Sequence, residues 1–243
     1  MSAEARPAFY ALAPSGWRDY ITLVHPPYTL WHLSYTAVGA CLAPHLDSTR
    51  LALVAAAFGL AVGIGAHALD ELNGRPLRTG IPKGVLVGLA VSSIAGAAAI
   101  GVVAAVLYSL WLLAFVAAGV VLVVAYNLEL FAGRLHTDLW FALAWGGFPV
   151  LTAYFAEAER IRWEAVLAAL FAVFGSLAQR RLSTTARTLR RRTRSVSGTI
   201  ERTDGTLEPI TVDSLLAAPE AALRALTAGT VALAVALLVL RLT

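Results

Sequence analysis

Residues 84–126 read GVLVGLAVSSIAGAAAIGVVAAVLYSLWLLAFVAAGVVLVVAY and contain no charged side chain. Because a helix rises about 1.5 Å per residue, this run is long enough to cross the roughly 30 Å hydrocarbon core of a bilayer twice. It predicts two membrane-spanning helices with a turn near Tyr108 and Ser109. Further apolar runs raise the number of predicted spans to seven, at residues 27–45, 51–71, 84–106, 109–126, 138–157, 163–180 and 221–241.

The composition of the whole chain agrees with a membrane protein. Of its 243 residues, 58% are hydrophobic and 14% are charged, whereas soluble domains carry about 25% charged residues. The apolar runs are long and continuous, which excludes the alternating ten-residue strands of a membrane β-barrel. We therefore expect an all-α fold, a polytopic transmembrane helical bundle with about seven spans.

Basic residues predict the orientation of this bundle. With the N-terminus in the cytoplasm, 14 of the 19 Lys and Arg residues fall on the cytoplasmic side, in agreement with the positive-inside rule. We expect an integral protein of a bacterial or archaeal plasma membrane, with its C-terminus outside. The predicted parts are an interfacial segment (1–24), a transmembrane core (25–194), a cytoplasmic linker (195–220) and a C-terminal transmembrane helix (221–243).

The end of the second span carries the most distinctive polar side chains. Helical spacing predicts that His67, Asp70 and Glu71 share one face, and Asn73 follows three residues after Asp70. Carboxylate and amide oxygens suit Mg²⁺, which protein sites hold with one or two carboxylates and substrate phosphates. The sequence therefore predicts Asp70, Glu71 and Asn73 as metal ligands. Alternatively, the two acids only mark the membrane interface, and Asn73-Gly74 ends the helix.

Cations follow in each predicted cytoplasmic loop. Guanidinium groups bind phosphate oxygens in pairs, but loop cations also fix orientation and attract anionic lipids. Phosphorylation of the Ser and Thr residues between the arginines of 180–194 is a further alternative. A nucleic-acid site is not expected, because no aromatic side chains alternate with these arginines. The candidate diphosphate-binding residues are Arg75, Arg78, Lys83, Tyr126, Asn127, Arg134, Arg180 and Arg181.

The order of these features resembles the UbiA superfamily of intramembrane prenyltransferases over roughly residues 22–190. The sequence motifs on which the resemblance rests are His25-Pro26-Pro27-Tyr28-Thr29, the acidic cluster at the end of the second span, Arg75-Pro76 followed by Ile81-Pro82-Lys83-Gly84, Tyr126-Asn127 with Arg134, and Trp145-Gly146-Gly147-Phe148-Pro149-Val150.

The resemblance implies a helical bundle around a lipid-open cavity, in which Mg²⁺ and cations hold the diphosphate of a polyprenyl donor. The implied reaction transfers the isoprenoid group to a lipophilic acceptor, and anionic membrane lipids are expected partners. Asp70, Glu71 and His67 would be the catalytic residues, with Asp70, Glu71 and Asn73 on the metal. His67 is expected to be a hydrogen-bond partner of the metal site or a proton acceptor.

The chain departs from the family in three respects. Only Asp70 matches the first aspartate-rich motif, and no carboxylate lies between Glu164 and Glu201, where a second motif is expected. The family also has nine spans rather than seven. Two interpretations remain: a divergent prenyltransferase in which arginines replace part of the metal site, or a catalytically inactive isoprenoid-binding or assembly protein.

Overall fold

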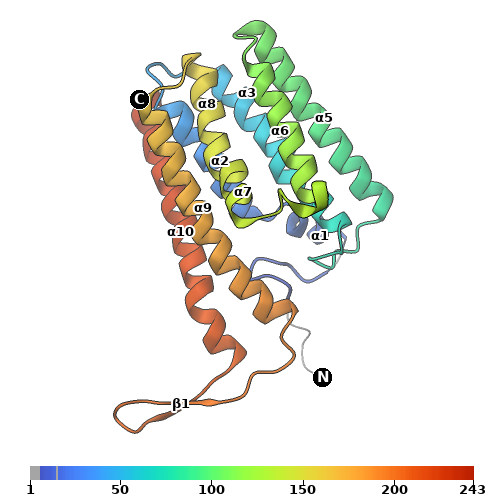
Figure 1. Ribbon diagram of the computed structural model, residues 1–243, viewed down its shortest axis with the longest axis vertical. Coiled ribbons are helices and arrows are strands. Elements are labelled where there is room, and N and C mark those ends of the chain that lie inside the picture. Colours follow the sequence, from blue (N-terminus) through green and yellow to red (C-terminus); the bar gives the residue numbers. More distant parts are fainter. Residues whose placement is uncertain (1–5, 15) are drawn as a thin grey trace.

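The computed structural model describes residues 6–14 and 16–243, and this part of the chain is almost entirely helical (Figure 1). Residues 1–5 and 15 of the predicted interfacial segment lie outside the described residues, and the rest of that segment contains the short helix α1 (Trp17–Leu23). The all-α prediction is confirmed. The bundle consists of α2 (Pro26–Cys41), α3 (Ser48–Phe58), η1 (Gly59–Ala66), α4 (His67–Leu72), α5 (Lys83–Leu107), α6 (Leu112–Asn127), η2 (Phe131–Gly133), α7 (Asp138–Ala142), η3 (Leu143–Gly147), α8 (Phe148–Ala158), α9 (Trp163–Arg191) and α10 (Val212–Leu242).

Within the described residues, five helices are long and apolar enough to cross a bilayer. The charge-free run forms α5 and α6, and the chain turns between Leu107 and Leu112, as the sequence predicts. Helices α2 and α6 have 16 residues each, which corresponds to about 24 Å and is less than the hydrocarbon thickness. The five long helices are Ser48–Leu72, Lys83–Leu107, Asp138–Ala158, Trp163–Arg191 and Val212–Leu242.

The region around the predicted linker is more ordered than the sequence suggests. Helix α9 continues to Arg191 instead of ending near residue 180, and strands β1 (Thr199–Glu201) and β2 (Leu207–Pro209) form a small antiparallel hairpin at the tip of the molecule (Figure 1). Helix α10 begins at Val212, where the side chains of Thr211 and Ser214 form a capping box. This cap places Pro219 inside α10, so the helix begins well before the predicted span.

Small residues allow the central helices to approach closely. Helix α2 packs against α8 and α10, and a Cβ atom on Gly39 would collide with the carbonyl group of Val150 on α8. A Cβ atom on Gly146 would lie 2.6 Å from the carbonyl oxygen of Ala172 on α9. Because both obstacles are backbone atoms, only glycine is compatible with the present spacing of these helices.

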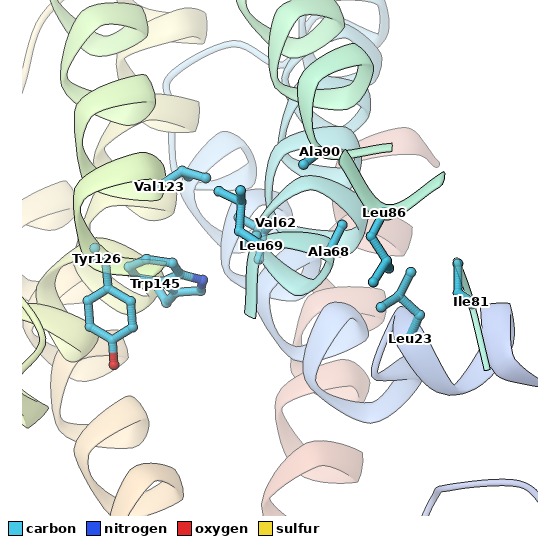
Figure 2. Close-up of a cluster of buried hydrophobic side chains, with 12 residues drawn as sticks. Leu23, Val62, Ala68, Leu69, Ile81, Leu86, Ala90, Val123, Tyr126 and Trp145 are labelled. Atoms are coloured by element: carbon cyan, nitrogen blue, oxygen red, sulfur yellow. The ribbon is translucent and has the colours of Figure 1, made fainter. Parts of the chain in front are cut away.

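A cluster of buried apolar side chains joins η1, α4, α5, α6 and η3 (Figure 2). Val62, Leu69 and Leu86 lie inside it, whereas Tyr126 and Trp145 lie at one side. Figure 2 shows the hydroxyl group of Tyr126 pointing away from the aliphatic side chains of the cluster. Tyr126 and Trp145 therefore mark a boundary between the apolar core and a polar region.

The two ends of the bundle differ in charge. At one end, Arg241 donates to the carbonyl oxygens of Ala43 and Pro44, and Arg50 pairs with Glu159. The connections 73–82, 128–137 and 192–211 lie at the other end (Figure 1), together with most of the cations of the chain. The cation-rich end contains the polar cavity that is described next.

Candidate functional site

A cavity of about 390 Å³ opens at the cation-rich end of the bundle. This volume lies in the range of small-molecule sites. Its walls come from the segment before α1, the N-terminal part of α2, the end of α4, the end of α6, α7 with η3, the polar half of α9 and Glu220 on α10. The chemically relevant lining residues are Tyr10, His25, Tyr28, His32, His67, Asp70, Tyr126, Asn127, His136, Trp145, Gln179, Arg180, Ser183, Thr184, Arg187, Arg190, Arg191, Arg192 and Glu220.

Helix α9 supplies the positive charge of this cavity. Residues that are three, four or seven apart share one face of a helix. Arg180, Arg187 and Arg191, at spacings of seven and four, line the cavity. Arg180 pairs with Asp138 at 3.1 Å. Arg190 forms two hydrogen bonds with the carboxylate of Glu220, at 2.6 and 3.0 Å, and thereby ties α9 to α10.

Arg187 and Arg191 are different, because no described carboxylate lies within ion-pair distance of either side chain. Arg187 donates to the carbonyl oxygen of Ser183 and to the Thr184 hydroxyl, both at 3.2 Å. Arg191 donates to the carbonyl oxygen of Pro7 at 2.9 Å. Both guanidinium groups are thus held in place by neutral acceptors, and their charges remain largely uncompensated.

Two histidines of the cavity lining stack on each other. His25 precedes Pro26, the first residue of α2, and adopts a left-handed conformation with φ 45°. Its ring lies 4.0 Å from that of His67 at an angle of 10°, and its Nδ1 shares a hydrogen bond of 2.9 Å with the Tyr10 hydroxyl. The Nδ1 of His67 donates to the carbonyl oxygen of Gly63 at 3.1 Å.

Burial changes the acidity of the Tyr10–His25 pair. Burial lowers the pKa of His25 well below its usual value, and the neighbouring His67 and Arg191 act in the same direction. Burial, and then the nearby Tyr28, raises the pKa of Tyr10 well above its usual value. Both groups are therefore neutral at pH 7.

Several buried polar atoms of the cavity lack a hydrogen-bond partner among the described residues. They are the Nε2 atom of His25, the hydroxyl group of Tyr126 and the Oε1 atom of Gln179. The exposed fractions of these residues are 9%, 6% and 5%. An unsatisfied buried polar group costs about 1–3 kcal/mol, so these atoms indicate that the cavity accommodates a polar ligand or water.

Trp145, directly before the Gly-Gly-Phe-Pro segment, lines the polar cavity, whereas Phe148 within the segment lies in the wall of a neighbouring apolar groove. Pro149 has no N–H group, so that the carbonyl oxygen of Trp145, four residues earlier, lacks its usual helical donor. His32 replaces this donor, with its Nδ1 2.7 Å from the Trp145 oxygen. The helix widens to the π form over Leu143–Gly147, and π-helical turns are frequent at functional sites.

An apolar groove of about 110 Å³ adjoins the polar cavity. It is lined by side chains of α3, η1, α5, α6, η3 and α8, among them Phe58, Phe115 and Phe148. Trp145 lines both the groove and the polar cavity. The site therefore combines a cationic compartment with an apolar one, which suits a ligand with a charged head and a hydrocarbon tail.

Asp70 and Glu71 do not face the same space. Asp70 lines the polar cavity, whereas Glu71 is fully buried beside the loop after α4. One oxygen of Glu71 accepts from the backbone N–H and the hydroxyl of Thr79, at 2.8 and 2.9 Å, and the other accepts from the backbone N–H of Leu77 at 2.9 Å. Consecutive helical residues point about 100° apart, so the two carboxylates diverge.

The other predicted metal ligand also lies outside the cavity. Asn73 is exposed, and its amide lies 3.5 Å from the Glu129 carboxylate. In the described part of the chain, no three His, Cys, Asp or Glu side chains are placed to hold a metal ion. The predicted set of Asp70, Glu71 and Asn73 therefore does not converge, and Asp70 alone is available from the cavity.

The predicted diphosphate-binding residues divide into two groups. Tyr126, Asn127 and Arg180 line the cavity together with His67 and Asp70. Arg75 instead donates to the carbonyl oxygens of Thr79 and Ile81, at 2.9 and 2.7 Å, and so stabilises its own loop. The remaining predicted residues are exposed and outside the cavity lining, namely Arg78, Lys83, Arg134 and Arg181.

Sequence reasoning left several cavity residues out of the candidate site. Arg187 and Arg191 were expected to attract lipids from a loop, although their spacing from Arg180 is helical and could have placed them on one face. Nothing in the sequence indicates that Tyr10 meets His25, because this contact depends on the path of the N-terminal segment.

Comparisons of the chain with protein-family models, with curated proteins and with solved structures returned no match. The resemblance to the UbiA superfamily therefore stays a prediction from the sequence.

Proposed function

We propose that the protein is a UbiA-like membrane prenyltransferase, which transfers an isoprenoid group from a polyprenyl diphosphate to a lipophilic acceptor. The observation that carries this proposal is the pair of adjoining compartments, one cationic and one apolar, that meet at Trp145 among membrane-spanning helices. A prenyl diphosphate has the same two-part character. Its head fits the arginines of α9 and its tail fits the groove.

In the proposed reaction, the bond between the allylic carbon and the diphosphate oxygen breaks, and this carbon forms a bond to the acceptor. The diphosphate leaves with the bonding electrons, and positive groups such as Arg180, Arg187 and Arg191 stabilise its charge. The rings of Tyr126 and Trp145 supply aromatic faces that can stabilise a carbocation-like carbon. The resemblance implies Mg²⁺ as a further neutralising charge, but the predicted ligands Asp70, Glu71 and Asn73 do not converge to hold it.

The acceptor loses a proton in this reaction, and His67 is suited to receive it. Because the Nδ1 of His67 donates to the carbonyl oxygen of Gly63, the Nε2 atom of a neutral ring carries the free lone pair. Asp70 is the second candidate, since it is the cavity carboxylate without an arginine partner within ion-pair distance among the described residues. Both side chains belong to the same helix, α4.

Turnover tests the proposal. Purified protein in detergent is incubated with geranylgeranyl diphosphate and a membrane lipid extract as the source of acceptor, and release of diphosphate is measured. We expect release by the wild type and a loss of about 100-fold or more in Asp70→Asn, without a change in Tm. The matched control is Asp213→Asn, an exposed acid outside the cavity, which should retain the wild-type rate. Equal rates for both variants would exclude Asp70 from the reaction.

A non-catalytic isoprenoid-binding protein is the second candidate. The divergence of Asp70 and Glu71 favours it, because the cavity then lacks the paired acids of the resembled family. This candidate predicts that geranylgeranyl diphosphate binds and can be recovered intact. Diphosphate release that depends on Asp70 would rule it out.

The proposal includes seven spans with the N-terminus in the cytoplasm and the C-terminus outside. In this arrangement the cavity faces the cytoplasm, where soluble diphosphates are available. Cysteine labelling tests it in a Cys41→Ser background, with Arg134→Cys and Arg160→Cys as two separate reporters at opposite ends of the bundle. A membrane-impermeant maleimide should label intact cells only at position 160, and labelling at position 134 alone would reverse the orientation.

A further inference from the structure

Two arginines on the cationic face of α9 differ from the others in how their charge is balanced. Arg187 and Arg191 lie partly buried in the cavity without a described carboxylate partner in ion-pair distance, whereas Arg180 and Arg190 are paired with acids. Burying an unpaired charge is unfavourable. Two such charges on one helix face are therefore expected to be compensated by an anion.

The charge of the complete lining points in the same direction. Five arginines line the cavity, but Asp70 and Glu220 are its only described carboxylates. Glu220 is occupied by two hydrogen bonds from Arg190. Asp70 alone therefore faces the charges of Arg187 and Arg191, which leaves the lining with a net positive charge.

The unpartnered polar atoms supply further ligands for phosphate oxygens. When Tyr10 donates to the Nδ1 of His25, the proton of the neutral ring lies on Nε2 and is available to an acceptor. The Tyr126 hydroxyl is a second free donor. Guanidinium forks, a ring N–H and a phenol O–H are all donors, as a phosphate group requires.

A divalent cation has much less to bind in this space. Mg²⁺ takes oxygen ligands, usually one or two carboxylates together with phosphates and water. Glu71 directs both oxygens to the backbone of its own loop, and Asn73 is outside the cavity. The cavity thus offers few carboxylates to a divalent cation but several guanidinium groups to an anion.

From these observations we infer that the cavity binds the diphosphate or phosphate group of its ligand through Arg187 and Arg191, without a divalent cation. This inference rests on the proposed function, because it concerns the head group of the same ligand. The phosphate group is recognised by geometry as well as charge, since a guanidinium group presents a planar pair of donors and an ammonium group does not.

Binding of two probes tests the inference, with purified full-length protein in detergent. The probes are geranylgeranyl diphosphate and inorganic diphosphate, and each Kd is measured in EDTA and in Mg²⁺. We expect the Kd of each probe to differ by less than about threefold between the two conditions. Binding that disappears in EDTA and returns with Mg²⁺ would overturn the inference. Lipid binding in EDTA that inorganic diphosphate does not compete with would also overturn it, because recognition would then reside in the tail.

Arginine variants connect the binding to the two side chains. In EDTA, Arg187→Gln and Arg191→Gln should each weaken binding by about tenfold or more, because each removes charge-assisted hydrogen bonds. Arg187→Lys keeps the charge and the stem but loses the fork, and should fall between wild type and Arg187→Gln. Arg194→Gln removes the same charge from an exposed position near the end of α9 and should bind as wild type.

Thermal unfolding of each variant, measured without ligand, separates a loss of binding from a loss of fold. Wild-type affinity in both Arg187→Gln and Arg191→Gln would refute the role of these arginines. The release of diphosphate is measured separately. If the probe binds in EDTA but no diphosphate is released, this inference holds and the transferase proposal is refuted. If diphosphate is released but the probe binds only with Mg²⁺, the transferase proposal holds and this inference is refuted.

Discussion

Glu71 distinguishes a structural carboxylate from a metal ligand. Its two oxygens accept three hydrogen bonds from Leu77 and Thr79, at 2.8–2.9 Å, and its side chain is fully buried. In Glu71→Gln, the amide oxygen can retain the two donors of Thr79, but the new NH₂ group faces the N–H of Leu77. The N–H of Leu77 then loses its acceptor and faces a second donor, and this mismatch costs about 1–3 kcal/mol.

A loss of this size is measurable. For a chain of this length, each kcal/mol corresponds to a fall in Tm of about 2–4 °C, so Glu71→Gln should unfold about 2–12 °C below the wild type. Scanning fluorimetry in detergent without ligand or divalent cation measures this difference. Glu129→Gln is the matched control, because Glu129 is an exposed acid with one contact of 3.5 Å, to Asn73, and its Tm should be unchanged.

The opposite result would refute the structural role of Glu71. If Glu71→Gln unfolds at the wild-type temperature and instead weakens diphosphate binding only in the presence of Mg²⁺, its carboxylate is a metal ligand. The loop after α4 would then have to release the side chain when the ligand binds.

Two further predictions concern packing and pH. Gly146→Ala should destabilise the protein by about 1–3 kcal/mol, because the new methyl group would lie 2.6 Å from the carbonyl oxygen of Ala172; Gly88→Ala, where nothing lies within 4 Å, should not lower Tm. Because the pKa of His25 is lowered in the folded state, the unfolded chain takes up a proton on this side chain first as the pH falls below about 6.5. The free energy of unfolding should therefore be unaffected by His25 above this pH and decrease below it, by up to about 1.4 kcal/mol per pH unit. The Tm of the wild type should therefore fall between pH 7.5 and 5 more steeply than that of His25→Asn, and parallel profiles would contradict the assignment.

The fold was largely accessible from the sequence, because the bilayer imposes simple rules. A charge-free run too long for one crossing must turn, and the chain does so between Leu107 and Leu112. The predicted helix boundaries differ from the structure at the polar ends of α9 and α10, because hydropathy does not distinguish a polar helix end from a loop. Helix α9 extends to Arg191 and α10 begins at Val212, because an ion pair between Arg190 and Glu220 joins two polar helix ends that the sequence presents as a linker.

The candidate site was accessible only in part. Asp70 and its neighbour Glu71 look equivalent in sequence, but the helix directs one into the cavity and the other toward Thr79. The choice depends on the path of the following loop, which has no periodic pattern. His25 is a similar case, since its stacking on His67 depends on the packing of α2 against η1, which directly precedes His67.

The walls of the cavity come from both ends of the sequence, which has a consequence for biosynthesis. Pro7 and Tyr10 from the N-terminal segment and Glu220 on α10 all line it. Arg190 and Glu220 are separated by 30 residues, which a ribosome adds in about 2–6 s at 5–20 residues per second. During this interval Arg190 of α9 has been synthesised without its partner on α10. A nascent chain that stops before residue 220 would thus keep Arg190 without this ion pair, and α9 would not be tied to α10 at its polar end.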